Sequence, residues 1–178
     1  MNFFFNVKMK LKILIVFLFS TLLANSQGRM NHQREVVHEV SNKEVVQSIY
    51  PTAAEVKKSN DYWYNIIDNQ GKVLGYAMNS KTYCQDVIGY RKQTPVMIIT
   101  SKNGEIRKVA LLTNYETPGY VNLLEKNGFF NLWNGKNLKE AQQVEIDGYS
   151  GATVTALAVE KNVKFLLEKG MKVKPKSR

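Results

Sequence analysis

Residues 96–112 read VMIITSKNGEIRKVALL, and this stretch decides the fold. Two apolar, β-branched runs, Val96–Thr100 and Ile106–Leu112, flank the turn sequence Lys102-Asn103-Gly104. Such a pattern predicts an antiparallel hairpin. Upstream, Tyr62–Ile67 and Lys72–Met78 flank a second turn sequence and predict another hairpin.

The segments around the two hairpins predict mostly short helices. Besides a loop over 114–119, the expected elements are a helix over Lys43–Ile49 capped by Ser41 or Asn42, a strand over Tyr83–Tyr90, helices over Val121–Asn127 and Leu138–Gln142, a strand over Val144–Ile146, and a helix over Thr153–Glu168. Gly128 and Gly170 are expected to end the helices before them. The fold class that follows is α+β, with antiparallel hairpins packed against short helices and a C-terminal helix.

Composition indicates one globular domain. The chain has 178 residues, 44% of them hydrophobic, and a single cysteine, Cys84, which we expect to be buried. The formal charge of +10 is concentrated in residues 1–26 and in the last ten residues, so the part between them is close to neutral. No basic helix or arginine-rich run is present, and we therefore expect no nucleic-acid partner. Neither the cysteine nor the histidine pattern predicts a metal site.

The N-terminus has the pattern of a signal peptide. Three lysines precede an apolar run over 13–24, and the small residues Ala24 and Ser26 then predict cleavage before Gln27. The run is shorter than the ~20 residues that span a bilayer, although an uncleaved anchor is the alternative. We expect a signal peptide over 1–26, a linker over 27–42, a single folded domain over 43–170 and a basic tail over 171–178.

Chemistry is concentrated just before the last predicted helix. Ser150-Gly151-Ala152-Thr153 places two hydroxyl groups and two small residues at a helix N-terminus. Free backbone amides and the positive end of the helix dipole favour a phosphate there. Ordinary helix capping by Ser150 or Thr153 is the alternative interpretation.

This segment resembles a family motif. Asp147-x-x-Ser150-Gly151-Ala152-Thr153 is similar to the flavinylation motif of the FMN-binding domain family, whose members include the extracytoplasmic subunits NqrC and RnfG. Glu116-Thr117-Pro118-Gly119 resembles a second signature of that family, in the correct order. Two departures concern the ring environment: the Gly89-Tyr90 segment lacks the family's second glycine, and Tyr120-Val121 replaces its usual Leu-Gly.

The resemblance implies covalent FMN, joined through its phosphate to the hydroxyl of Thr153. A separate flavin transferase that uses FAD and Mg²⁺ would recognise the motif, in which Asp147 matters. Ser150, Gly151 and Ala152 would leave room for the phosphate, and Thr155 is a further candidate contact. The loop of Glu116, Thr117, Pro118 and Gly119 would approach the flavin ring.

Several aromatic residues are candidates for the flavin ring or for the core. Tyr120 and Tyr149 flank the two motifs and are candidates for stacking on the ring, although ordinary packing is the alternative. Phe129, Phe130 and Trp133 are expected to form a packing cluster. Arg91 and Lys92 are expected to lie on a solvated loop.

The function that follows is an exported electron carrier, periplasmic or on the outer face of the cytoplasmic membrane. Its redox donor and acceptor are not specified by the sequence, and components of a membrane electron-transport chain are candidate partners. No catalytic constellation predicts a reaction of its own. The alternatives are a non-redox binding module, in which the motif only caps a helix, and an extracellular flavin reductase.

Overall fold

A computed structural model describes residues 36–146 and 149–175. Its centre is an antiparallel sheet of five strands, arranged in sequence order. The strands are β1 (Ala53–Lys58), β2 (Trp63–Asp68), β3 (Val73–Asn79), β4 (Val96–Thr100) and β5 (Ile106–Leu111). Both predicted hairpins are therefore confirmed, as β2–β3 and β4–β5.

The sheet has two buried faces because alternate residues of its strands point to opposite sides. On β4, Val96 and Ile98 belong to one core cluster, while Met97 and Ile99 belong to the other. Every residue of β4 is buried, which explains why its sequence is apolar up to the buried Thr100.

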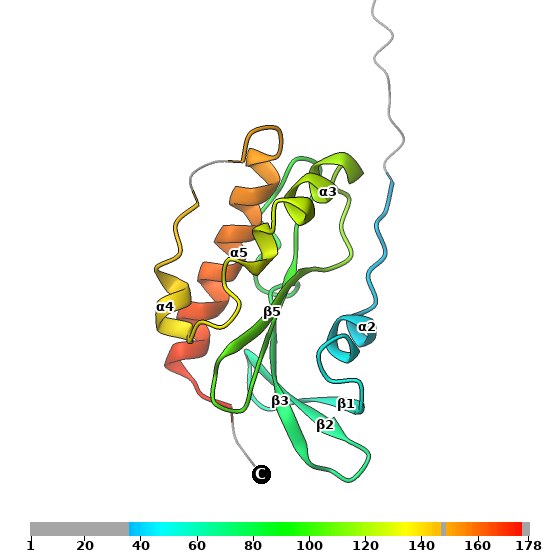
Figure 1. The fold of residues 1–178 in the computed structure, drawn as a ribbon, viewed down its shortest axis with the longest axis vertical. Helices are drawn as coiled ribbons and strands as arrows, with labels where there is room; N and C mark the ends of the chain where they lie inside the picture. The colour runs from blue at the N-terminus through cyan, green and yellow to red at the C-terminus, as the bar shows by residue number, and fades with distance from the viewer. Residues whose placement is uncertain (1–35, 147–148, 176–178) are drawn as a thin grey trace, which may run out of the picture. The chain divides into compact units, whose positions relative to one another are not determined.

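Helices cover both faces of the sheet (Figure 1). They are α2 (Asn42–Gln47), α3 (Pro118–Lys126), the 3₁₀ turn η1 (Phe129–Asn131), α4 (Leu138–Gln142) and α5 (Thr153–Lys172). The larger core lies under α5, α3 and α4, and α2 covers the other face with Val45 and Val46. The α+β prediction is confirmed. Ser41 caps α2 by accepting a hydrogen bond from the Glu44 amide, as one of the two expected candidates.

The last helix lies across the sheet and begins beside α3. The indole Nε1 of Trp63 donates a hydrogen bond of 3.2 Å to the carbonyl of Gly170, and the Asn162 amide donates one of 3.2 Å to the carbonyl of Thr94. The first bond attaches the C-terminal part of α5 to β2. The second attaches the middle of α5 to the segment before β4. In Figure 1 the start of α5 and the start of α3 lie at the same end of the domain.

Four expectations about secondary structure were wrong. Residues 83–90 form no strand. The amides of Tyr83 and Cys84 donate to the Ser80 carbonyl in a turn, and one isolated bridge pairs Ile88 with Gln93. Residues 144–146 are irregular, because Val144 and Ile146 pack on the larger core as single side chains. Pro118 and Gly119 belong to the first turn of α3, where proline is well tolerated, instead of to a loop.

The fourth error concerns the end of the last helix, which continues through Gly170 to Lys172. A Cβ atom at Gly170 would lie 2.5 Å from the Met78 sulfur and 3.0 Å from the Trp63 ring. The glycine therefore allows close packing of α5 on the sheet. Strand β1 was not predicted, since five of its six residues are exposed and show no apolar alternation.

The described residues contain no helix that is both long and apolar enough to cross a bilayer. The predicted signal peptide and most of the predicted linker lie outside the described residues.

Candidate functional site

Thr153 is the first residue of α5, and its side chain is exposed. Its hydroxyl donates a hydrogen bond of 2.8 Å to the carbonyl of Tyr149. The N-cap position is held by Ala152, and among the described residues no side chain caps the helix. The interpretation that Ser150 or Thr153 caps this helix through its side chain is therefore wrong. The first amides of a helix have no acceptor within the helix, so they are available to an anion here.

The backbone before Thr153 has little space for side chains. Gly151 has a φ of +86°, a left-handed conformation that favours glycine, and a Cβ atom there would lie 3.3 Å from the Leu123 side chain of α3. Ala152 is buried and Ser150 is exposed. The sequence Ser-Gly-Ala-Thr thus forms a tight turn that presents the Thr153 side chain at the surface. Asp147, the other predicted residue of this motif, lies outside the described residues.

Glu116 lies at the centre of a hydrogen-bonded cluster. Its side chain is buried, and its carboxylate accepts hydrogen bonds from the backbone amides of Tyr90 at 3.2 Å and Arg91 at 3.3 Å. The hydroxyl of Thr155, which is fully buried, donates to the same carboxylate. One side chain therefore joins the 89–91 segment to the first turn of α5.

Neighbouring residues fit closely around this carboxylate. The Glu116 amide donates a hydrogen bond of 2.9 Å to the side-chain oxygen of Asn114, whose own amide group donates to the Leu112 carbonyl at 2.8 Å. A Cβ atom at Gly89 would collide with the Glu116 carboxylate and the Thr94 methyl group. These contacts fix the loop between β5 and α3, with Thr117 at the N-cap position of α3 and Pro118 and Gly119 exposed.

Two tyrosines, one exposed and one partly buried, form an aromatic pair beside the cluster. Tyr90 is 50% exposed, and its ring meets the ring of Tyr120 edge to face at a centroid distance of 4.9 Å. The Arg91 guanidinium carbon lies 5.7 Å from the centre of the Tyr90 ring. A hydrogen bond between the two hydroxyl groups raises the pKa of Tyr120 above its ordinary value.

The other aromatic candidates serve the core. The Tyr149 ring packs edge to face on Phe129 at 4.9 Å, and Phe129 contacts Trp133 at 5.4 Å. The predicted packing cluster of Phe129, Phe130 and Trp133 is confirmed, and Tyr149 joins it. Lys92 lies over the Tyr115 ring at 4.2 Å.

The structure brings the two predicted motifs together but gives their residues different surroundings. Thr153 and Ser150 are exposed at the start of α5, whereas Glu116 and Thr155 are buried and bonded to each other. Sequence reasoning related the Gly89-Tyr90 segment to the flavin ring only through the family resemblance, and it did not find Asn114 as part of this region. Tyr90 follows Gly89 in a segment that was predicted to be a strand, and nothing in the sequence indicates its contact with Tyr120.

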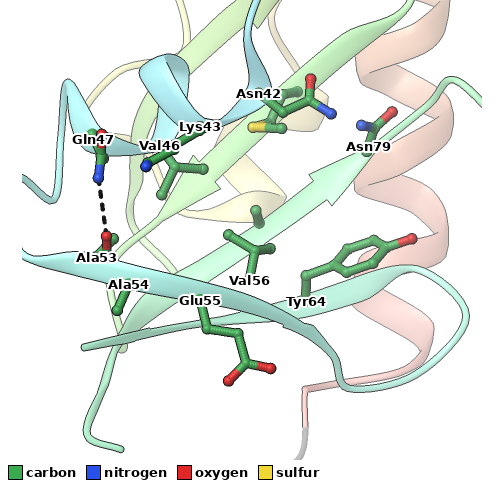
Figure 2. A pocket seen from close by; sticks show the side chains of 12 residues that line it. Asn42, Lys43, Val46, Gln47, Ala53, Ala54, Glu55, Val56, Tyr64 and Asn79 are labelled. Carbon is green, nitrogen blue, oxygen red and sulfur yellow. Dashed lines mark hydrogen bonds between the residues drawn. The ribbon is translucent and has the colours of Figure 1, made fainter. Parts of the chain in front are cut away.

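A cavity of about 440 Å³ lies on the opposite face of the sheet (Figure 2). Val46, Ala53, Tyr64 and Met97 contribute to its wall, and the Gln47 side chain donates a hydrogen bond of 3.1 Å to the Ala53 carbonyl at its edge. None of the predicted site residues lines this cavity. It is therefore separate from the region around Thr153.

Comparison with known families matches residues 89–168 to the model of the FMN-binding domain. This match includes the Glu116 cluster, Tyr90, Tyr120 and the whole segment around Thr153. The matched segment is similar to the FMN-binding domain and contains both motifs that the sequence analysis identified. The match excludes α2 and the first three strands.

Among solved structures, the crystal structure of Shewanella oneidensis NqrC is similar to 76% of this chain and 79% of that chain. The sequence identity is 14% and the TM-score is 0.39. Comparison with curated proteins finds no match.

The residues around Thr153 fit the chemical parts of FMN. The uncapped start of α5 suits the phosphate, and the turn at Gly151 leaves the Thr153 side chain accessible. The Tyr90–Tyr120 pair, in which Tyr90 is exposed, offers an aromatic surface next to this helix end.

Proposed function

We propose that this protein is an exported electron-transfer flavoprotein that carries FMN through a phosphoester on Thr153. The observation that carries the proposal is the uncapped, exposed position of Thr153 at the start of a 20-residue helix within the FMN-binding domain. A threonine that served only as a helix cap would direct its hydroxyl to the amides of the first turn. Thr153 instead donates to the preceding Tyr149 carbonyl.

The attachment reaction requires a separate flavin transferase with FAD and Mg²⁺. The Thr153 oxygen forms a bond to the phosphorus of the FMN half of FAD, and the bond to the AMP half breaks. AMP leaves, and the hydroxyl proton is released. No oxidation or reduction accompanies this transfer.

The residues at the start of α5 then have complementary roles. The amides of the first turn would donate to the remaining phosphate oxygens, and Ser150 is exposed beside them. Gly151 and Ala152 carry no bulk that would obstruct the transferase. Bound FMN supplies reversible transfer of one or two electrons, while the protein positions it and adjusts its potential.

Covalent attachment suits a location outside the cytoplasm. A dissociated flavin would be lost by dilution there, whereas an ester to the protein retains it. The lysines and apolar run of residues 1–26 support export to the periplasm or to the outer face of the cytoplasmic membrane. We propose a flavin transferase as one partner and membrane electron-transport components as candidate donor or acceptor.

The proposal is tested by the mass and visible spectrum of denatured protein, purified from a host that has a flavin transferase. Flavin absorption that remains with the unfolded chain supports covalent attachment. A colourless chain with the mass of the unmodified polypeptide would refute it. Reversible binding of FMN by the native protein would then be the remaining function of the domain.

A further inference from the structure

We propose that the Tyr90–Tyr120 pair contacts the flavin ring, and that Glu116 acts as a positioning residue that holds Tyr90 beside the attachment helix. This inference rests on the proposed attachment of FMN to Thr153. The sequence analysis expected Glu116 to approach the flavin ring. In the structure its carboxylate is buried and bonded to Thr155, so it would act on the ring only through its neighbours.

The first step of the argument is the position of Tyr90. Its backbone amide and the Thr155 hydroxyl both donate to the same oxygen of Glu116, Oε2. Thr155 lies two residues after Thr153, within the same turn of α5. Glu116 therefore places Tyr90 close to the residue that would carry the flavin.

The second step is the exposure of Tyr90, with Tyr120 partly buried beside it. A tyrosine side chain that is 50% exposed leaves much of its ring without protein neighbours. Tyr120 contacts it edge to face, which fixes the angle between the two rings. A flat, largely apolar ring system such as that of the flavin is bound by aromatic surfaces of this kind.

The third step is the cation beside the pair. The Arg91 guanidinium group lies over the Tyr90 ring, and the Arg91 amide is held by Glu116. A positive charge at this place would favour the anionic, reduced form of a flavin. The cluster thus positions an aromatic surface and a cation with a single carboxylate.

A competing surface lies on the exposed side of α5 itself. Val154 and Leu157 are 50% and 40% exposed, and they lie on one side of the helix near Thr153. Unlike the tyrosine pair, this surface is aliphatic, and no cation–π contact involves it among the described residues. The test must therefore distinguish the two surfaces.

The first experiment measures flavin fluorescence in native protein that has been shown to carry covalent FMN. A tyrosine in contact with an excited flavin quenches its emission by a transient electron transfer that reverses. We expect Tyr90→Leu and Tyr120→Leu to raise the emission severalfold without loss of attached FMN. Tyr64→Leu, on the opposite face of the sheet, is the control and should leave the emission unchanged.

Two results separate failure of the inference from failure of the proposed function. Attached FMN whose emission is the same in both tyrosine variants would overturn the inference, as would a change caused by Leu157→Ser alone. Wild-type protein without attached FMN would overturn the proposed function, and the inference with it.

The second experiment tests Glu116 as a positioning residue, first in the flavin-free protein and then in the loaded protein. Amide hydrogen exchange in the flavin-free protein is expected to be slow at Tyr90 and Arg91, and faster in Glu116→Ala. Thr155→Val removes the hydroxyl donor and should also raise flavin emission in the loaded protein, while Thr155→Ser should restore the wild-type value. Equal emission in the valine and serine variants would contradict the positioning role.

Discussion

The Thr155 hydroxyl donates a hydrogen bond to the Glu116 carboxylate across 39 positions of the chain. Both side chains are buried, and the bond connects the start of α5 to the loop that precedes α3. The same carboxylate accepts hydrogen bonds from the backbone amides of Tyr90 and Arg91. Loss of the Thr155 hydroxyl is therefore expected to disturb the start of α5, the loop that holds Glu116 and the 89–91 segment together.

The first prediction follows from this contact and concerns stability. Thr155→Val should lower the free energy of unfolding by about 1–3 kcal/mol, because a buried carboxylate loses a hydrogen-bond donor. Thr155→Ser retains the hydroxyl and should lose less. Urea denaturation followed by circular dichroism measures the difference. A valine variant as stable as wild type would show that the bond contributes no net stability.

The packing of α5 on the sheet gives a second prediction. Gly170→Ala should destabilise the protein by about 1–3 kcal/mol, because the added methyl group overlaps Met78 and Trp63. This loss would exceed the gain of about 1 kcal/mol that alanine normally brings to a helix interior. Thermal unfolding monitored by circular dichroism measures the change.

Gly119→Ala is the matched control, since a Cβ atom there meets nothing within 4 Å. This variant should be unchanged or stabilised by up to about 1 kcal/mol. Stabilisation by Gly170→Ala would contradict the close packing of α5 at this position.

The sequence was sufficient for the hairpins because their strands are apolar runs separated by strong turn residues. It was insufficient for β1, an edge strand whose exposed side chains carry no alternating pattern. Gly170 was misinterpreted because a glycine near a helix end usually stops the helix, whereas here it accommodates Met78. The cause in both cases is a tertiary contact, which local patterns do not encode.

The candidate site was predictable only in part, for the same reason. The motif around Thr153 is contiguous, so its position before a helix could be predicted from local sequence. The Glu116–Thr155 bond joins residues far apart in the chain, and the Tyr90–Tyr120 contact requires α3 to begin at Pro118. Neither relationship leaves a signal in a single sequence.

A third prediction concerns the single cysteine. Burial raises the pKa of the Cys84 thiol to about 11, with a smaller contribution from Asp86. The thiol is therefore protonated at pH 8, and iodoacetamide should label it much more slowly in native protein than in urea. Since the folded thiol titrates above the ordinary value of 9.0, its contribution to stability is lost as the pH rises toward about 11. Equal labelling rates in both states would contradict burial.

Export gives a fourth prediction. The mature chain is expected to begin at Gln27, because small residues at Ala24 and Ser26 follow the apolar run. N-terminal sequencing of protein from the native host measures this directly. Retention of residues 9–26 would favour an uncleaved membrane anchor.

The fifth prediction concerns the attachment residue. Thr153→Ala should abolish flavin that survives denaturation, because the phosphoester needs the side-chain oxygen. The substitution removes one exposed hydrogen bond to the Tyr149 carbonyl, so it should cost about 1 kcal/mol of stability and leave the protein folded. Thr153→Ser and Ser150→Ala are matched controls, since both keep an oxygen on residue 153, and both should retain flavin.

The most direct test is the intact mass of denatured wild-type and Thr153→Ala protein, both produced in a host with a flavin transferase. We predict that wild-type protein carries the added mass of one FMN with the yellow colour of flavin, and that the alanine variant has the mass of the unmodified chain. Unmodified wild-type protein, or an alanine variant that still carries FMN, would contradict attachment at Thr153.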